Sequence, residues 1–133
     1  APHTLEEKSN KYTKAPSGGP LVQHALVAMM EAHHNGRISV EKMVEKMSHA
    51  VATCFQIKER GFIREGYYAD LVLVKEAPYV ITNENILYKC GWSPLEGHQF
   101  TYQPEKVWVN GVLGYDGGLT ENYNPQRLLF NRG

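Results

Sequence analysis

The chain has 133 residues, a length that predicts one domain or part of one. Apolar residues make up 42% of it and charged residues 21%, as in ordinary globular proteins. The 14 Lys and Arg residues balance the 14 Asp and Glu residues, so no overall charge attracts nucleic acid or an anionic membrane. No apolar run reaches the ~20 residues of a membrane helix, and no signal-like segment is recognisable. These observations predict a cytoplasmic protein with no nucleic-acid and no membrane partner.

Residues 1–20 have the composition of a long irregular loop. They contain three prolines, two glycines and many polar side chains, without an apolar period. A structureless loop of this length is uncommon inside a compact protein and usually serves a function. We therefore expect the binding chemistry of the chain in this loop.

The next segment, about residues 20–58, has the period of α-helices. Apolar side chains recur every three or four residues between Leu21 and Met30, which predicts one buried helix face. Asn35-Gly36 is typical of a helix end, and Ser39 can cap the helix that follows. The sequence predicts helices over about residues 20–34, 39–47 and 49–57.

From about residue 61 the pattern becomes that of β-strands. Short runs with β-branched and aromatic side chains predict strands over 69–74, 79–82 and 100–102, the first of them buried. Residues 106–113 predict a hairpin, because the Asn110-Gly111 pair accepts positive φ at both turn positions. The polar tail that follows contains Leu128-Leu129-Phe130, which must pack on another element or fray.

Two kinds of residue invite a site and are not assigned one. Cys54 and Cys90 lie far apart without a second thiol nearby, which favours two reduced, packed thiols over a single disulfide. His33 and His34 lack a second ligand at helical spacing, so we expect them at the surface rather than on a metal. The same interpretation applies to His24, His49 and His98, and Trp92 and Trp108 are expected to pack against apolar neighbours.

Several motifs together resemble the late part of the bacterial-type dihydroorotases, a family of the amidohydrolase superfamily. The resemblance begins at Ala1-Pro2-His3-Thr4, Glu7-Lys8 and Ala15-Pro16-Ser17-Gly18, and it continues to about Gly118. Later segments that carry it are Gly61-Phe62-Ile63-Arg64-Glu65-Gly66, Ala69-Asp70-Leu71-Val72-Leu73-Val74, Trp92-Ser93-Pro94-Leu95-Glu96-Gly97 and Val109-Asn110-Gly111.

The resemblance implies an α/β fold in two parts. Residues 1–58 would be the end of a metal-dependent (β/α)8 barrel, with a substrate loop over 1–20 and then the helices. Residues 59–115 would supply strands of the small amidohydrolase β-sandwich domain, and residues 116–133 would form the C-terminal tail.

The activity that the resemblance implies is the reversible hydrolysis of the cyclic amide of dihydroorotate to N-carbamoyl-aspartate, in pyrimidine biosynthesis. The family uses a binuclear zinc centre held by a His-x-His pair, a carbamylated lysine, two further histidines and an Asp that would stand two residues before Ala1. None of these ligands falls within the 133 residues. We therefore expect the isolated chain to hold no catalytic zinc, to contain no catalytic residue and to be inactive.

Substrate binding is the role that the resemblance leaves to this chain. It implies that His3, Ser17 and Gly18 bind the substrate carboxylate and that Gly19 is a loop hinge. An imidazole N–H can donate to a carboxylate oxygen, and a glycine lets the backbone approach a ligand closely. In the alternative interpretation, Pro2-His3 is a turn with a solvent-facing histidine and the glycines only mark the start of a helix.

Other functions stay open at this point. One is a non-catalytic dihydroorotase-like scaffold that pairs with another pyrimidine enzyme, such as aspartate transcarbamoylase. Another is a related cyclic amidohydrolase such as allantoinase, although allantoinases and dihydropyrimidinases tend to differ at the position of His3. The expected partners are the small-molecule substrate, the remainder of the dihydroorotase polypeptide and a second copy of the protein. An excised chain would expose its apolar helix face, so we expect it to aggregate, oligomerise or copurify with that remainder.

Overall fold

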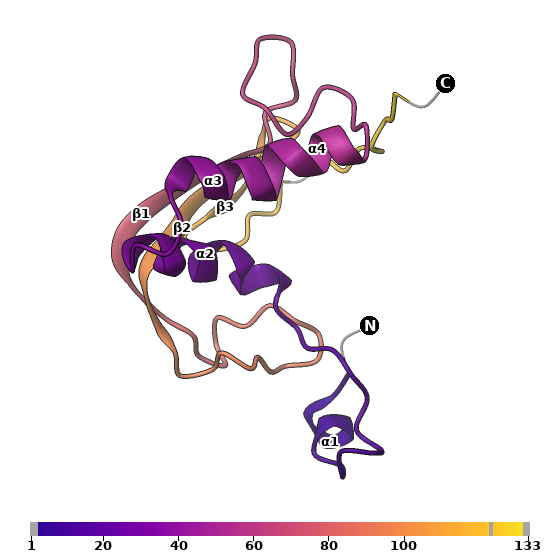
Figure 1. The fold of residues 1–133 in the computed structure, drawn as a ribbon, viewed down its shortest axis with the longest axis vertical. Helices are drawn as coiled ribbons and strands as arrows, with labels where there is room; N and C mark the ends of the chain where they lie inside the picture. The colour runs from indigo at the N-terminus through magenta and orange to yellow at the C-terminus, as the bar shows by residue number, and fades with distance from the viewer. Residues whose placement is uncertain (1–2, 123, 132–133) are drawn as a thin grey trace.

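The computed structural model describes residues 3–122 and 124–131. Helix α2 packs against strand β2 of a curved antiparallel sheet, and α1 lies apart from both (Figure 1). The described chain is therefore α/β, as expected. In chain order the elements are α1 (Leu5–Lys8), η1 (Val22–His24), α2 (Ala25–His34), α3 (Val40–Val44), η2 (Glu45–His49), α4 (Ala50–Cys54), β1 (Leu71–Val80), β2 (Gln99–Val109) and β3 (Val112–Asp116).

The three strands are neighbours in chain order, and β2 lies in the middle. Val109 pairs with Val112, so β2 and β3 form a tight hairpin. Asn110 and Gly111 have φ of 53° and 79°, the left-handed values that a two-residue turn of this kind requires. The predicted hairpin is confirmed.

Two expected strand boundaries are absent. The strands predicted over 69–74 and 79–82 are one strand, β1, which contains Pro78, and β2 likewise runs through Pro104. The register between β1 and β2 shifts between Glu76 and Tyr79, and again next to the Val74–Pro104 pair. Bulges of this kind accommodate a residue that has no N–H to donate, which is why the prolines do not end the strands. The expected burial of the first strand is also wrong, because Val72 and Leu73 are exposed.

The helices that follow residue 38 form one continuous run. Ser39 Oγ accepts a hydrogen bond from Lys42 N at 3.2 Å, which confirms the predicted cap. The interruption expected near residue 48 does not occur. Instead the wide π-helical turn η2 joins α3 to α4, and the run ends at Cys54, earlier than predicted.

The core lies where α2 meets the ends of β1 and β2. Val27, Ile81 and Phe100 form it, with Ala28, Tyr79, Ile86 and Leu95 packed around them. The helix face predicted from Leu21 onward is rotated, since Val22 is 85% exposed and His24 is fully buried. A tighter 3-10 turn, η1, precedes α2 and shifts which side chains point inward.

A second helix face is apolar and uncovered. Val40, Val44, Met47, Val51 and Phe55 recur every three or four residues along the run from α3 to α4, with exposures between 36% and 52%. Their neighbours Met43 and Ala52 are buried. Side chains at this spacing share one side of a helical run, so the exposed residues form a stripe.

A polar cluster around the buried Arg60 joins the start of β1 to the hairpin. Arg60 is only 7% exposed, and its guanidinium pairs with Asp70 and donates to Asn110 Oδ1 at 2.5 Å. Asp70 Oδ1 in turn accepts from Asn110 N at 2.7 Å. Asp70 therefore holds both a buried cation and the turn in place, and this accounts for an acidic residue directly before an apolar strand.

The tail returns to the end of α4. Lys58 N donates to Leu129 O at 2.8 Å and Asn131 N to Gln56 O at 2.8 Å. Leu128, Leu129 and Phe130 are nevertheless exposed, so the expected packing of these side chains is incomplete. Within the described part of the chain, no helix combines the length and the apolar character needed to cross a membrane. Cys54 and Cys90 are unpaired, and Cys54 is exposed rather than packed.

Candidate binding loop

The expected loop over residues 1–20 is regular over one short stretch, so its description as irregular throughout is wrong. Helix α1 begins after Thr4, whose Oγ1 accepts from Glu7 N at 3.2 Å, while Glu7 Oε2 accepts from Thr4 N at 2.8 Å. This reciprocal pair is a capping box, which a Thr followed three residues later by Glu favours. Residues 1 and 2 of the predicted loop lie outside the described residues.

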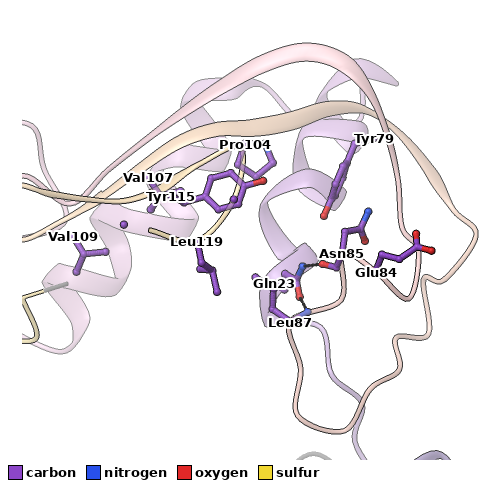
Figure 2. Close-up of a pocket in the computed structure, with 13 residues that line it drawn as sticks. Gln23, Tyr79, Glu84, Asn85, Leu87, Pro104, Val107, Val109, Tyr115 and Leu119 are labelled. Carbon is purple, nitrogen blue, oxygen red and sulfur yellow. Dashed lines mark hydrogen bonds between the residues drawn. The ribbon is translucent and has the colours of Figure 1, made fainter. Parts of the chain in front are cut away.

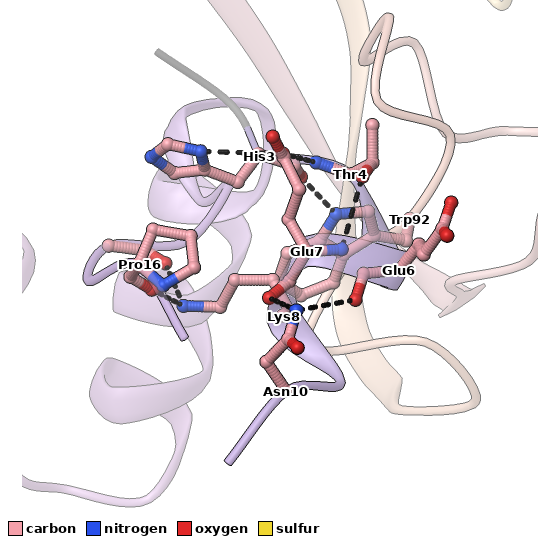
Figure 3. Close-up of polar contacts among 9 residues, drawn as sticks. His3, Thr4, Glu6, Glu7, Lys8, Asn10, Pro16 and Trp92 are labelled. Atoms are coloured by element: carbon pink, nitrogen blue, oxygen red, sulfur yellow. Dashed lines mark hydrogen bonds and ion pairs between the residues drawn. The ribbon is translucent and has the colours of Figure 1, made fainter. Parts of the chain in front are cut away.

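His3 stands at the entrance to α1 with its ring half-open to solvent. Its Nδ1 lies 3.4 Å from Glu7 Oε2, and its side chain is 36% exposed. The Thr4 N–H chiefly holds the pKa of the Glu7 carboxyl below its usual range, and His3 adds to that effect. The carboxylate orients the ring from its Nδ1 side, which leaves Nε2 available to a ligand (Figure 3).

Lys8 ties α1 to the turn that carries Ser17 and Gly18. Its Nζ donates to Pro16 O at 2.5 Å and to Gly18 O at 2.8 Å. Figure 3 draws the ammonium against Pro16, with the His3 ring on the same side of α1. One side chain therefore connects α1, which His3 precedes, to the second half of the loop.

The segment Trp92-Ser93-Pro94, which comes much later in the sequence, contacts the loop and supports it. Trp92 Nε1 donates to His3 O at 2.7 Å. A Cβ built on Gly19 would lie 4.0 Å from Pro94 Cγ, so the two residues are in contact distance. Trp92 was expected to pack, and its hydrogen bond to the backbone of a predicted site residue is an additional role.

The backbone of the loop presents unused donors. Gly18 has φ of 87°, a conformation that side chains disfavour, although a Cβ there would meet no atom within 4 Å. Among the described residues none accepts a hydrogen bond from the N–H of Ser17, Gly18 or Gly19. The glycine is thus required by the backbone conformation, and the turn leaves three N–H groups for a ligand.

His24 is buried against Ser93 and Tyr88, which corrects its predicted place at the surface. Its Nδ1 lies 3.1 Å from Ser93 Oγ, and its ring meets the edge of Tyr88 with centroids 5.7 Å apart. Within the described structure its Nε2 has no hydrogen-bond partner. Burial lowers the pKa of His24, so the ring is neutral at physiological pH.

No described group of three or more His, Cys, Asp or Glu side chains could hold a metal ion. His33, one of the histidines considered from the sequence, instead places Nδ1 3.1 Å from Ile38 O. The described side chains therefore do not by themselves form a zinc centre.

A cavity of about 480 Å³ lies elsewhere, between the sheet and the loop that follows β1 (Figure 2). Tyr79, Tyr115 and Leu119 are among the residues that line it, and Gln23 from η1 is another. Gln23 Nε2 donates to Asn85 O at 2.7 Å, and its Oε1 accepts from Leu87 N at 2.9 Å. None of the predicted site residues lines this cavity, so it is separate from the binding loop.

The binding roles predicted for His3, Ser17 and Gly18 stay predictions, and the sequence did not indicate the side chains that hold their backbone in place. Lys8 and Trp92 are those side chains, and each stands inside a motif that carries the family resemblance. Their position within those motifs was the available signal. The distances that join them are not visible in a sequence, because Trp92 lies 89 residues after His3.

No family model matches the chain. The fold is that of the cyclic amidohydrolases: an L-hydantoinase (dihydropyrimidinase) from Arthrobacter aurescens aligns with a TM-score of 0.72 and 26% identity, over 80% of this chain and 24% of that one. A dihydroorotase from Halobacterium salinarum is 36% identical over 96% of this chain and 30% of its own length. The multifunctional protein pyr1-3 of Dictyostelium discoideum is 33% identical over 89% of this chain and 5% of its own length.

These matches first define a class of protein, the cyclic amidohydrolases of the amidohydrolase superfamily. Within that class the chain corresponds to the C-terminal portion of a dihydroorotase, so the resemblance stated from the sequence is confirmed. The chain spans less than a third of the length of each of these relatives.

Proposed function

We propose that this chain is the carboxylate-binding segment of a dihydroorotase that interconverts dihydroorotate and N-carbamoyl-aspartate in the cytoplasm. The observation that carries the proposal is the shared fixation of His3 and the 16–18 turn on α1, through Glu7 and Lys8. A half-exposed imidazole and unused backbone N–H groups on one braced loop suit a small carboxylate.

The exposed apolar stripe over α3 and α4 supports the view that the segment works against further polypeptide. Contiguous apolar faces of this kind are rarely left in water. In the proposed arrangement residues 1–58 close the catalytic barrel and residues 59–115 belong to the small β-domain. The stripe then packs against the remainder of the protein.

In the proposed reaction the chain binds and orients rather than performs the chemistry. The His3 ring donates to one carboxylate oxygen of the substrate, and the Ser17–Gly18 backbone donates to the other. These two contacts orient the substrate ring so that its amide faces the catalytic centre. A binuclear zinc centre, held by residues outside this chain, would supply the nucleophilic water.

The proposal is tested on the complete polypeptide that contains these residues, with dihydroorotate as substrate. We expect hydrolysis by the unchanged protein. In His3→Ala we expect a KM for dihydroorotate about tenfold higher with kcat nearly unchanged, because one charge-assisted hydrogen bond to the carboxylate is lost. The matched control is His34→Ala, an exposed histidine on α2, which should leave KM unchanged. Absence of hydrolysis by the metal-loaded complete protein would contradict the proposal.

The structural match to an L-hydantoinase favours a second candidate, a hydrolase of another cyclic amide. A neutral hydantoin has no carboxylate for His3 to bind. Measuring kcat/KM for dihydroorotate, hydantoin and allantoin on the same preparation separates the two, and we expect dihydroorotate to be preferred. A preference for hydantoin or allantoin would support the second candidate.

A role as a non-catalytic scaffold within a larger pyrimidine assembly is the third reading. The relative from Dictyostelium is named a multifunctional protein, which supports physical association with other activities. Size-exclusion chromatography with aspartate transcarbamoylase, combined with the activity assay, tests it. Binding without hydrolysis would favour the scaffold.

A further inference from the structure

We propose that Lys8 is a positioning residue for the substrate carboxylate, a role that rests on the proposed function for the identity of its ligand. The sequence resemblance assigns Lys8 no function. Among the described residues, no hydrogen bond or ion pair joins the Lys8 side chain to His3. It acts through the backbone, by fixing the turn that follows Pro16 and by adding positive charge beside it.

The geometry of the two hydrogen bonds sets the orientation of the turn. Lys8 Nζ accepts no bond and donates to Pro16 O and Gly18 O at 2.5 Å and 2.8 Å. Described peptide bonds are all trans, so the N–H of each peptide unit points opposite to its C=O. The N–H groups of Ser17 and Gly19 therefore point away from the ammonium, toward the open side of the turn.

The positive charge of Lys8 can act on a ligand across the turn, because its ammonium is bonded to two carbonyl oxygens of that turn. No described carboxylate forms an ion pair with it, and the carboxylate of its neighbour Glu7 is occupied by Thr4 and His3. An ammonium bonded to two carbonyl oxygens also polarises those peptide groups, which strengthens their N–H groups as donors. Both effects favour an anion on the far side of the turn.

A second anchor fixes the start of the same loop. Trp92 Nε1 binds His3 O at 2.7 Å, so the backbone of His3 is held independently of Lys8. Loss of the Lys8 ammonium should therefore release the 16–18 turn while α1 and His3 remain in place. This separation makes the role of Lys8 measurable by itself.

The experiment uses the complete polypeptide and two readouts. Lys8→Met removes the ammonium and keeps most of the aliphatic stem, Lys8→Arg restores charge and donors, and Lys11→Met is a matched control that loses the same charge from the same loop. The first readout is KM and kcat for dihydroorotate. The second is the rate of trypsin cleavage after Lys14, followed by mass spectrometry, which reports the freedom of the turn without requiring activity.

We expect Lys8→Met to raise KM about tenfold with kcat within about twofold, as for the loss of binding shared by ground and transition states. Cleavage after Lys14 should be about tenfold faster, since local opening governs proteolysis of a loop. Lys8→Arg should recover most of both values. Lys11→Met should resemble the unchanged protein.

The outcomes separate this inference from the proposed function. Faster cleavage in Lys8→Met, in a protein that does not hydrolyse dihydroorotate, would retain Lys8 as the brace of the turn and overturn its role toward this substrate. Cleavage and KM equal to those of Lys11→Met would overturn the inference while leaving the dihydroorotase proposal standing. An equal rise of KM in both variants would assign the effect to overall charge and would also overturn it.

Discussion

The binding loop and the sheet are held together by different means. Residues 3–19 depend on a few side-chain bonds, from Lys8 and Trp92 to backbone oxygens. The sheet depends on continuous backbone pairing between β1, β2 and β3, reinforced by the Arg60 cluster at the hairpin. Ladder bonds support one another along a strand, whereas each loop bond is nearly independent of the rest.

The two regions should therefore respond differently to substitution. A change in the sheet or its polar cluster should lower the stability of the fold and leave ligand binding intact until the protein unfolds. A change in the loop anchors should alter binding with little loss of global stability, because few apolar contacts depend on them. The following substitutions test that division.

The largest effect is expected for Asp70→Ala. This change leaves the Arg60 guanidinium buried without its ion-pair partner and removes the acceptor for Asn110 N. We expect the free energy of unfolding to fall by about 2 kcal/mol, because a buried guanidinium loses a charged partner that is itself partly exposed. Urea unfolding of the complete protein measures it, and KM for dihydroorotate at low temperature should stay unchanged.

The matched control for Asp70→Ala is Lys106→Met, which breaks an exposed ion pair with Asp116 on the same sheet. It should cost less than about 1 kcal/mol, since exposed pairs contribute little. Equal losses in the two variants would contradict the importance assigned to burial of the Arg60 cluster.

The next largest effect is the pH dependence of folding stability that His24 contributes. Because burial lowers the pKa of this histidine in the folded protein, the unfolded chain binds the proton first. Stability should be complete above the ordinary histidine value of about 6.5 and decline as pH falls below it, by up to about 1.4 kcal/mol per pH unit. Thermal unfolding between pH 5 and pH 8 checks this.

His24→Phe keeps an aromatic ring beside Tyr88 and cannot be protonated. Its unfolding should lose the part of the pH dependence that His24 contributes, whereas His34→Gln, at an exposed site, should retain it. A pH dependence that is unchanged in His24→Phe would rule out His24 as its source.

The smallest effect is expected for Trp92→Phe, which removes only the indole N–H that binds His3 O. The loss of one hydrogen bond is worth about 1 kcal/mol and should raise KM for dihydroorotate about fivefold. Trp108→Phe, in β2, is the control and should leave KM unchanged. A fall in global stability equal to the change in binding would show that Trp92 belongs to the core rather than to the loop.

Local features of this fold could be predicted from the sequence. The Asn110-Gly111 turn, the Ser39 cap and the helix end near Gly36 depend on residues within a few positions of each other. Each is determined by backbone preferences that the residue types carry themselves. The family resemblance was visible for the same reason, since its motifs are short and contiguous.

Features set by distant partners were missed or mispredicted. The break predicted between the strands over 69–74 and 79–82 is wrong, because a bulge opposite β2 accommodates Pro78. His24 was placed at the surface, but Ser93, 69 residues later, supplies its buried partner. The ties from Lys8 and Trp92 likewise depend on how the loop folds back. Composition and hydrophobic period do not specify contacts between separate segments of the chain, because these contacts form only when the chain folds.

The most direct test of the central claim is a crystal structure of the complete protein with dihydroorotate bound. The account predicts that one carboxylate oxygen of the ligand lies within about 3.2 Å of a His3 ring nitrogen and that the other lies within hydrogen-bond distance of the turn at Ser17 and Gly18. A ligand whose carboxylate is bound by other residues, with His3 facing solvent, would contradict it.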